Sequence, residues 1–362
     1  MINSRLPTVS QTAQTLYVTI GARLTTRLIT VKSLLSGIIC TLLMTLPRAG
    51  NSLSFPLPES GNDIVGEVRQ IQTRYEDTFS DIARANGLGY AEMAETNPQV
   101  DPWLPGEGTT VTLPTRFILP PGPREGVVVN LAELRLYYFP KGENRVITYP
   151  LGIGREGWST PTGQTRVTRK QQRPSWYPPE SIRQEHAAKG DPLPAVVKPG
   201  PDNPLGAHAI YLSMPGYLLH GTNKPYGVGM RVSHGCIRLY PEDIAALFEQ
   251  IEANTPVRII NEPYKAGWEN GRLYVEAHPP LSEQRAREGI NFTPLVRAII
   301  SALGDSDQKP DWGAMKQAAL GQRGIPVPVT PAVTPAIPLT TPAPRSLMLS
   351  ESEPVASESQ GR

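Results

Sequence analysis

Cysteine and net charge are both scarce in this sequence. Its 362 residues include only two cysteines, Cys40 and Cys236, so any thiol chemistry rests on very few positions. Lysine and arginine number 35 against 33 aspartates and glutamates, which gives a net charge of +2, and no long basic run stands out. No nucleic acid is therefore expected as a partner, because the charge balance offers no surface that would neutralise its phosphates.

Long apolar runs are missing as well. The apolar segment over residues 34–46 is too short for a transmembrane helix, which needs about 20 residues. Basic residues precede it and Ala49 and Gly50 follow it, an order typical of a secretory signal. We expect residues 1–49 to be a signal peptide and the chain to be exported; an uncleaved anchor or a buried helix is the alternative. Its removal leaves Cys236 without a partner for an internal disulfide.

Proline is abundant instead, with 39 residues in 362, about twice its average share. Several stretches are therefore expected to be loops or disordered. Residues 50–65 look like a linker, and the Pro/Thr/Ser-rich tail over 321–362 is predicted to be disordered. Residues 170–206 form a longer segment than ordinary connections, and we interpret it as a lid or substrate-shaping loop with one helix over 179–189.

Residues 66–115 are predicted to form a small β-α-α-β unit. Thr78 is placed to cap a helix that ends near Asn86, a second helix spans 90–95, and a closing strand spans 109–113. Through the run RYEDTFSDIARANGLGYAEMAETNPQVDPWLPGEGTTVTLP the unit resembles a LysM domain. The resemblance implies binding to the N-acetylglucosamine-containing glycan of peptidoglycan; a plain structural mini-domain is the alternative.

Strand patterns dominate the sequence after this unit, and the fold class is predicted to be β-rich α+β. A hairpin is expected around the turn at 140–144. Pro241, followed by acidic residues and by apolar residues at helical spacing, marks the start of the clearest helix. A C-terminal extension over 263–320 has a weaker helical pattern. The expected strands are 127–139, 145–153, 164–169, 209–213 and 257–260.

The segment HGTNKPYGVGMRVSHGCIRLY, residues 220–240, combines Cys236 with two histidines. A thiol is a useful nucleophile only as the thiolate, which needs a nearby base or positive charge. His220 and His234 are both available, and the geometry favours His220 because it comes from a different pass of the chain. The N–H groups of Gly235 and Cys236 are candidate oxyanion donors. A buried structural thiol and a zinc site, which would lack a fourth ligand, are the alternatives.

At these residues the chain resembles an L,D-transpeptidase catalytic domain of the YkuD type, expected over 124–262. The family pattern is a His-Gly pair followed by Ser/Thr-His-Gly-Cys, an apolar residue and Arg or Asn, with a T-P-x-G turn upstream. The resemblance implies a β-sandwich or barrel-like fold with a helix after the cysteine. The matching residues are His220, Gly221, Ser233, His234, Gly235, Cys236, Arg238 and Thr160.

Roles at these positions follow from the resemblance. It implies that Cys236 is the nucleophile and that His220 is the base, oriented by the carbonyl of Gly221. His234 and Gly235 would support the oxyanion and the substrate. Substrate-binding roles are expected for Ser233, Arg238 and Thr160; Arg238 would hold the loop or a substrate carboxylate, with a structural ion pair as the alternative. His186, His208 and His278 carry no motif and look like ordinary surface or loop histidines.

The implied reaction is acyl transfer on peptidoglycan tetrapeptide stems in the periplasm. The thiol would cleave the bond between meso-diaminopimelate and D-Ala, and an amine would resolve the thioester without a metal or organic cofactor. The resemblance is closest to the Gram-negative subgroup that attaches the Braun lipoprotein through its C-terminal lysine. Formation of 3-3 cross-links by the same chemistry and a non-catalytic peptidoglycan-binding protein are the alternatives.

Overall fold

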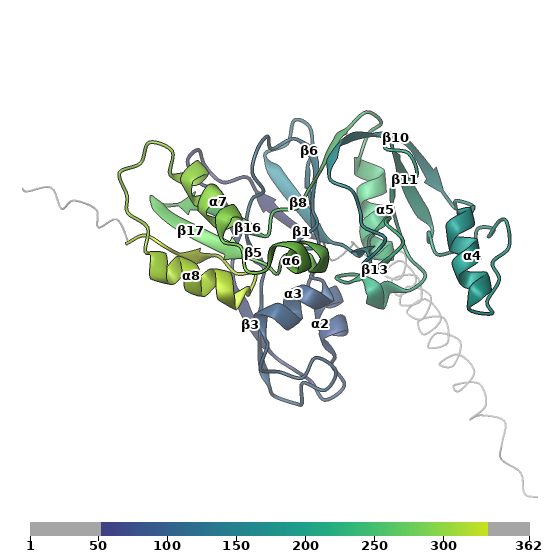
Figure 1. Ribbon diagram of the computed structural model, residues 1–362, viewed down its shortest axis with the longest axis horizontal. Helices are drawn as coiled ribbons and strands as arrows, with labels where there is room; N and C mark the ends of the chain where they lie inside the picture. Colours follow the sequence, from purple (N-terminus) through teal and green to yellow (C-terminus); the bar gives the residue numbers. More distant parts are fainter. Residues whose placement is uncertain (1–51, 332–362) are drawn as a thin grey trace, which may run out of the picture.

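The computed structural model describes residues 52–331 (Figure 1). The predicted signal peptide with Cys40 lies outside the described residues, and so does the predicted disordered tail from residue 332 onward. None of the helices within the described range has the length and apolar character that a membrane crossing requires.

A nine-stranded sheet organises the centre of the molecule, in the order β1-β8-β7-β6-β15-β10-β11-β12-β14. Gly152, just beyond β8, exchanges two backbone hydrogen bonds of 2.8 Å with Arg238 in β14, so the far edge strand returns to the other end of the sheet. The sheet is therefore curled around a core of aliphatic residues. Its strands are β1 Leu53–Pro56, β6 Gly126–Asn130, β7 Arg135–Phe139, β8 Arg145–Pro150, β10 Gly163–Gln172, β11 His208–Leu212, β12 Leu218–His220, β14 Ile237–Arg238 and β15 Pro256–Ile260.

Two strand predictions need correction. Residues 127–139 form two antiparallel strands, β6 and β7, because the chain reverses at 131–134, where Leu134 takes a φ of 54°. The predicted linker also contains β1, which pairs with β8. Its Phe55 ring lies 6.2 Å from the ring of Phe117, and this packing draws the segment onto the sheet. The hairpin between β7 and β8 forms as predicted.

The predicted β-α-α-β order is present below the sheet in Figure 1. Its elements are β3 Arg69–Gln72, α2 Phe79–Ala85, α3 Tyr90–Thr96 and β4 Thr110–Leu113, and β3 pairs with β4. Thr78 caps α2 in a reciprocal arrangement with Asp81. Phe79 and Met93 belong to one buried cluster with Val128 and Tyr137 of the large sheet, so this unit, which we call the β-α-α-β module, shares its core with the sheet.

Two helices lie near the β11–β12–β14 end of the sheet. Helix α5 (Pro241–Gln250) begins at Pro241 as predicted, and its apolar face packs against β11. Helix α4 (Glu180–Ala188) lies within the predicted lid segment and is the element farthest from α7 and α8 in Figure 1. A short 3-10 turn spans Pro225–Gly227. Two small strands, β9 (Ile153–Gly154) and β13 (Arg231–Ser233), pair in parallel beside β14.

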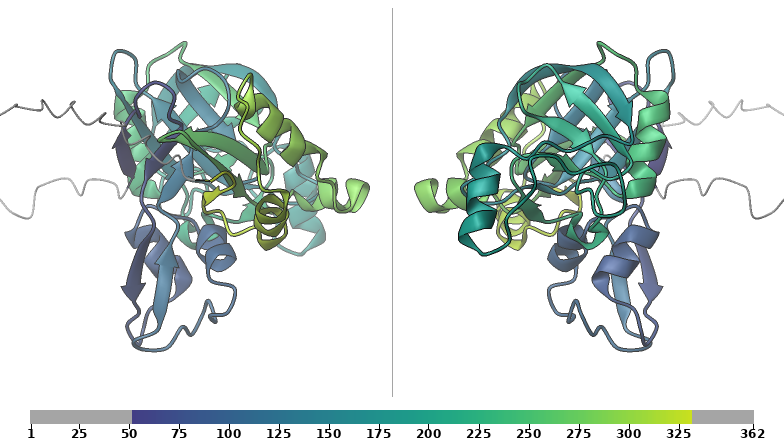
Figure 2. Two further views of the ribbon diagram at one scale, coloured as in Figure 1. Left: turned by 90° about the vertical axis from the view of Figure 1, so that its left-hand side faces the viewer. Right: turned by 90° about the vertical axis from the view of Figure 1, so that its right-hand side faces the viewer.

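The C-terminal extension is a unit with a core of its own, which faces the viewer in the left panel of Figure 2. The predicted start of the disordered tail at residue 321 is wrong, because Val327–Pro328 forms β18 and pairs with β17. A further two-stranded pair, β2 (Ile64–Gly66) with β5 (Arg116–Ile118), lies between this unit and the module. The other elements of the unit are β16 Tyr264–Glu269, β17 Arg272–Ala277, α6 Ser282–Glu288, α7 Thr293–Leu303 and α8 Trp312–Gly321.

A buried ionic cluster joins the C-terminal unit to the large sheet. The ammonium of Lys265 lies 2.6 Å from a carboxylate oxygen of Glu133 and 2.8 Å from one of Glu276. His278, expected to be an ordinary surface or loop histidine, is 3% exposed and lies 2.8 Å from Glu276. It is buried because the β16–β17 hairpin packs its polar residues against the sheet. We call Glu133, Lys265, Glu276 and His278 the junction cluster.

Candidate active site

Strand pairing brings together the two segments that carry the predicted nucleophile and base. Strands β12 and β14 run in parallel, with Leu219 opposite Ile237 and His220 opposite Arg238. Leu219 and Ile237 are fully buried in the core, so His220 and Arg238 project from the other face, since side chains alternate along a strand. Cys236 directly precedes β14, two residues before Arg238. It therefore enters the site at the start of the strand that lies beside β12.

The His220 ring is held in one tautomer. Its Nδ1 lies 2.6 Å from the carbonyl oxygen of Gly221, and because a carbonyl only accepts, Nδ1 carries the hydrogen. In the neutral ring Nε2 then has a free lone pair. Burial, followed by the positive charge of Arg238, lowers the pKa of His220 to about 3. The imidazole is therefore neutral near pH 7 and able to take up a proton.

Cys236 is a half-buried free cysteine. Its Sγ lies 3.8 Å from the carbonyl oxygen of Gly216, within reach of a thiol donor. Burial raises the pKa of Cys236, while a backbone hydrogen bond at Leu218 and the charge of Arg238 act in the opposite direction. The thiol of Cys236 and the imidazole of His220 are thus both neutral at rest.

The turn that carries Cys236 is held by hydroxyl groups. Ser233 Oγ accepts from the Gly235 N–H at 3.2 Å and donates to the Cys236 carbonyl at 2.5 Å. Thr160 Oγ1 donates to the Gly235 carbonyl at 2.9 Å. The φ of Gly235 is 100°, a conformation that favours glycine. A substrate-binding role was expected for Ser233 and Thr160, and the Gly235 N–H was an expected oxyanion donor. In the structure all three groups form hydrogen bonds within the turn that carries Cys236.

Arg238 is a cation to which the described residues offer no carboxylate partner. Within the described part of the chain no carboxylate oxygen lies within 4.0 Å of its guanidinium, and its buried Nε has no hydrogen-bond partner. Burial lowers the pKa of Arg238. The structural ion pair that was the alternative interpretation of this residue is therefore not found, and the charge faces the sulfur and the imidazole.

His234 connects the same turn to the lid segment. Its Nε2 lies 3.0 Å from Glu185 Oε2 on α4 and 3.1 Å from Arg155 Nη2. The ring also packs edge-on against Trp158, with 4.8 Å between centroids. A hydrogen bond from Lys189, with further bonds from His234 and the charge of Arg155, lowers the pKa of Glu185 to about 2. His234 therefore fastens α4 to the turn and does not lie free as a base.

Residues 124–259 match the YkuD family model, described as the L,D-transpeptidase catalytic domain. The Escherichia coli K12 protein named Probable L,D-transpeptidase YbiS is 42% identical over 284 residues, which cover 76% of this chain and 92% of that protein. Probable L,D-transpeptidase YcfS of the same strain is 47% identical over 292 residues, 79% of this chain and 90% of that protein. The chain belongs to the L,D-transpeptidase family. It is therefore an enzyme, as the resemblance implied.

Sequence reasoning missed two contributors to this L,D-transpeptidase site. Glu185 and Arg155 approach His234 from different segments, and the Arg155 guanidinium donates to Glu185 at 2.7 Å. The only signal in the sequence was the helix expected over 179–189, which places a carboxylate on the lid without saying what it meets. The matched family model begins after the β-α-α-β module, so the LysM-like character of that module stays a prediction.

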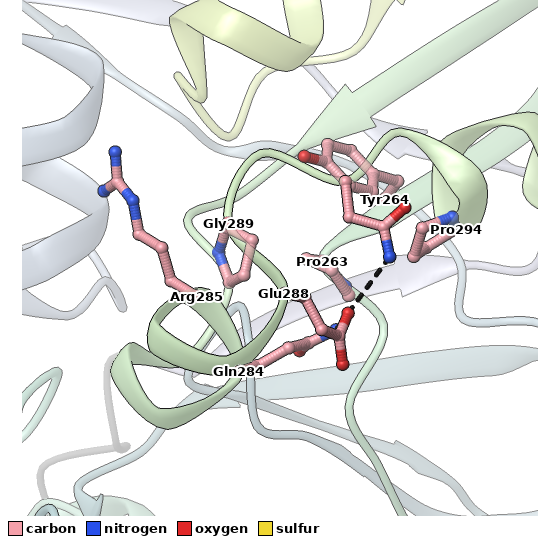
Figure 3. Close-up of a pocket in the computed structure, with 9 residues that line it drawn as sticks. Pro263, Tyr264, Gln284, Arg285, Glu288, Gly289 and Pro294 are labelled. Atoms are coloured by element: carbon pink, nitrogen blue, oxygen red, sulfur yellow. Dashed lines mark hydrogen bonds between the residues drawn. The ribbon is translucent and has the colours of Figure 1, made fainter.

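A group of possible metal ligands and the surface pocket of Figure 3 both lie away from this site. Among the described residues, ligand atoms of Glu133, Glu276 and His278 lie within 4.8 Å of one another, and the Lys265 ammonium already supplies a cation to both carboxylates there. The pocket in Figure 3 is formed by α6 and the start of β16, with Tyr264, Arg285 and Glu288 in its wall. No predicted site residue lines it.

Proposed function

We propose that this L,D-transpeptidase uses Cys236 as its nucleophile and His220 as its general base. The observation that supports the proposal most is the β12–β14 register, which sets His220 opposite Arg238, two residues after Cys236. The charge of Arg238 acts on both the Cys236 thiol and the His220 ring. The hydrogen bond from Nδ1 to the Gly221 carbonyl supports it further, because it leaves Nε2 as the proton acceptor. Roles for His234, Ser233 and Thr160 in holding the turn complete the arrangement.

The first half-reaction forms a thioester. Nε2 of His220 takes the thiol proton as Sγ attacks the carbonyl between meso-diaminopimelate and D-Ala of a tetrapeptide stem. The C–N bond then breaks, the imidazolium gives its proton to the leaving nitrogen, and D-Ala departs. Since both groups are neutral at rest, we expect the proton to move during the attack and not before it.

Negative charge on the tetrahedral intermediate needs a donor. The N–H of Cys236 is the proposed oxyanion donor, because Ser233 already accepts the N–H of Gly235. The unpaired guanidinium of Arg238 is proposed to bind a substrate carboxylate, which the stem peptide supplies. A buried cation without a partner is costly, and a carboxylate that arrives with the substrate removes that cost.

In the second half-reaction an amine attacks the thioester and gives its proton to His220. The C–S bond then breaks, and the imidazolium returns the proton to the Cys236 sulfur. We place the C-terminal lysine of a Braun-type outer-membrane lipoprotein first among the acceptors, as the subgroup resemblance implies, with the amine of a second diaminopimelate and a 3-3 cross-link as the alternative. The proposal includes export to the periplasm through residues 1–49 and binding of peptidoglycan glycan by the LysM-like module.

Acylation by a carbapenem tests the nucleophile directly. Incubation with meropenem is expected to add one drug mass to the wild-type protein, measured by intact mass spectrometry, because the β-lactam carbonyl acylates the same sulfur. Cys236→Ala should show no adduct. An unmodified wild type, or an equal adduct on Cys236→Ala, would contradict the assignment.

The acceptor is tested in a bacterial strain that lacks its own L,D-transpeptidases. Expression of this protein followed by muropeptide analysis should show stems that carry the lipoprotein C-terminal remnant. If 3-3 dimers accumulate and the lipoprotein remnant stays absent, the alternative acceptor is correct.

A further inference from the structure

One backbone contact links the β-α-α-β module to the segment between His220 and Cys236. The carbonyl oxygen of Gly229 accepts a hydrogen bond of 3.1 Å from the N–H of Ala91, in the first turn of α3. First-turn N–H groups have no partner inside their own helix, so Gly229 satisfies one of them from outside. The proposed catalytic segment thereby supplies part of the cap of a helix that belongs to another unit.

The contact leaves no room for a side chain on either partner. A Cβ on Gly229 would lie 2.2 Å from the Tyr90 nitrogen and 2.5 Å from Gly89 Cα. A Cβ on Gly89 would lie 2.7 Å from Gly229 Cα. Both glycines are therefore needed for the two backbones to touch, and Gly229 also takes a positive φ of 80°.

Gly229 is fixed on its catalytic side as well. Its N–H donates to the Leu151 carbonyl at 2.9 Å, and the next residue, Met230, accepts from the Ile153 N–H at 3.1 Å. Strand β13 follows directly and ends at Ser233, whose hydroxyl bonds to the carbonyl of Cys236. Only a few residues, each held by hydrogen bonds, separate Gly229 from the Cys236 turn. A displacement of Gly229 would therefore also displace that turn.

The module side of the contact is rigid for a separate reason. Glu92 of α3 accepts the Gly89 N–H at 2.6 Å and forms two hydrogen bonds of 2.7 Å with the fully buried guanidinium of Arg135 in β7. Near α5, the Arg84 side chain of α2 makes a two-point ion pair with Glu242, with distances of 2.7 and 2.8 Å. These contacts hold the module in a fixed position relative to the large sheet and α5. The position of the module therefore determines the position of Gly229.

We propose that Gly89 and Gly229 are positioning residues for the transpeptidation. Helix α3 holds the segment that ends at Ser233, so the module is part of the framework of the active site as well as the predicted glycan-binding unit. This inference rests on the proposed roles of Cys236 and His220. It assigns no chemical step to either glycine; they act only on the placement of the Cys236 turn.

Gly89→Ser in the full chain is the main test. Gly89 is the N-cap of α3 with a φ of −101° and a ψ of 162°, where serine is a favourable cap, so the variant keeps the helix start and adds only the obstructing Cβ. Meropenem is small and reacts at the sulfur, so its acylation needs no glycan contact. We expect the maximal acylation rate constant to fall by about tenfold or more, with a smaller change in the half-saturating concentration.

Gly142→Ala is the control for replacing a glycine outside the contact. Gly142 lies in the β7–β8 turn with open space around its Cβ position. Its positive φ of 79° makes the backbone strain of this variant greater than that of Gly89→Ser, so an effect of strain alone would show in the control. Its acylation rate should stay within about twofold of wild type. A folded Gly89→Ser with the wild-type rate would overturn the inference while leaving the proposed nucleophile intact. Loss of the adduct in the wild type would instead contradict the proposed function.

Hydrogen exchange of the wild type tests the contact without any substitution. The Ala91 amide is expected to exchange as slowly as the α3 amides bonded within the helix, because its partner is Gly229. Exchange of the Ala91 amide at the rate of an unbonded first-turn amide would overturn the inference, even if Gly89→Ser fails to fold.

Discussion

Two regions of the molecule bury a histidine beside a cation, and they treat the charges in opposite ways. In the junction cluster, Lys265 contacts two carboxylates and His278 contacts Glu276, so the buried charges are paired. At the active site His220 faces Arg238, and no carboxylate among the described residues lies within 4.0 Å of that guanidinium. The same residue types are therefore stabilising in one region and costly in the other.

The pKa values of the two histidines record this difference. A hydrogen bond to Glu276 and the nearby Glu95 carboxylate, 3.7 Å from Nδ1, outweigh burial and raise the pKa of His278 to about 10. Burial and Arg238 instead lower the pKa of His220 to about 3. A permanently charged imidazole serves as one half of an ion pair, and a neutral one serves as a base. The junction cluster therefore joins the C-terminal unit to the large sheet. At the active site the charge of Arg238 is left for the proposed substrate carboxylate.

The largest expected effect is the loss of activity on removal of the proposed base. His220→Gln should lower the rate constant for meropenem acylation by about 10²- to 10⁴-fold, the usual contribution of a positioned general base, with little loss of stability at pH 7 because the ring is neutral there. Single-turnover mass spectrometry measures the rate. His278→Gln is the counterpart and should acylate at close to the wild-type rate once folded. Equal rates for His220→Gln and wild type would remove the base assignment.

The second effect falls on stability. Lys265→Met leaves Glu133 and Glu276 buried without their cation, so the free energy of unfolding should drop by about 3–5 kcal/mol. Urea denaturation followed by tryptophan fluorescence measures it, and Lys141→Met, at an exposed turn position, should change it by less than about 0.5 kcal/mol. A drop as small as that of Lys141→Met would show that the cluster is not a structural element.

The two pKa shifts predict opposite dependences of the free energy of unfolding on pH. His278 has a folded pKa above that of the unfolded chain, so its stabilisation is complete below about pH 6.5 and disappears as the pH rises toward 10. His220 has a folded pKa below the unfolded one, so the folded state loses stability as the pH falls from about 6.5 toward 3.

Unfolding free energies measured across pH separate the two limbs. His278→Gln should reduce only the loss of unfolding free energy at alkaline pH. His220→Gln should reduce only the loss at acid pH, because each variant removes one titrating group. If either variant flattened the other limb, the assignment of the shifts to these two residues would fail.

The sequence predicted more of the active site than of the junction cluster, and the reason is physical. Cys236, His234 and Arg238 lie in one short segment of the sequence, and the strand that follows Cys236 places Arg238 opposite His220. The turn within 131–134 escaped detection because apolar residues continue through it, and the pattern of an uninterrupted strand looks the same.

Long-range packing decided what the sequence left out. His278 looked ordinary because its burial is not visible in the local sequence: besides Glu276, it lies 3.7 Å from Glu133, which is far away in the chain on the turn between β6 and β7. Glu185 was placed on a helix, yet its contact with His234 depends on how the lid folds back. The contact between Gly89 and Gly229 likewise joins segments that have no shared pattern.

The smallest expected effect concerns the unpaired cation. Arg238→Gln should lower kcat/KM for a tetrapeptide donor by about tenfold to a hundredfold, the worth of one hydrogen-bonded charge, while the free energy of unfolding stays the same or rises because Arg238 has no carboxylate to lose. Kinetics with a tetrapeptide and with its amidated analogue measure the effect: wild type should discriminate between them, and Arg238→Gln should not. Arg135→Gln, whose guanidinium is paired with Glu92, is the opposite case and should lose stability. If Arg238→Gln lost stability as Arg135→Gln does, the contrast between a structural and a substrate-binding charge would be wrong.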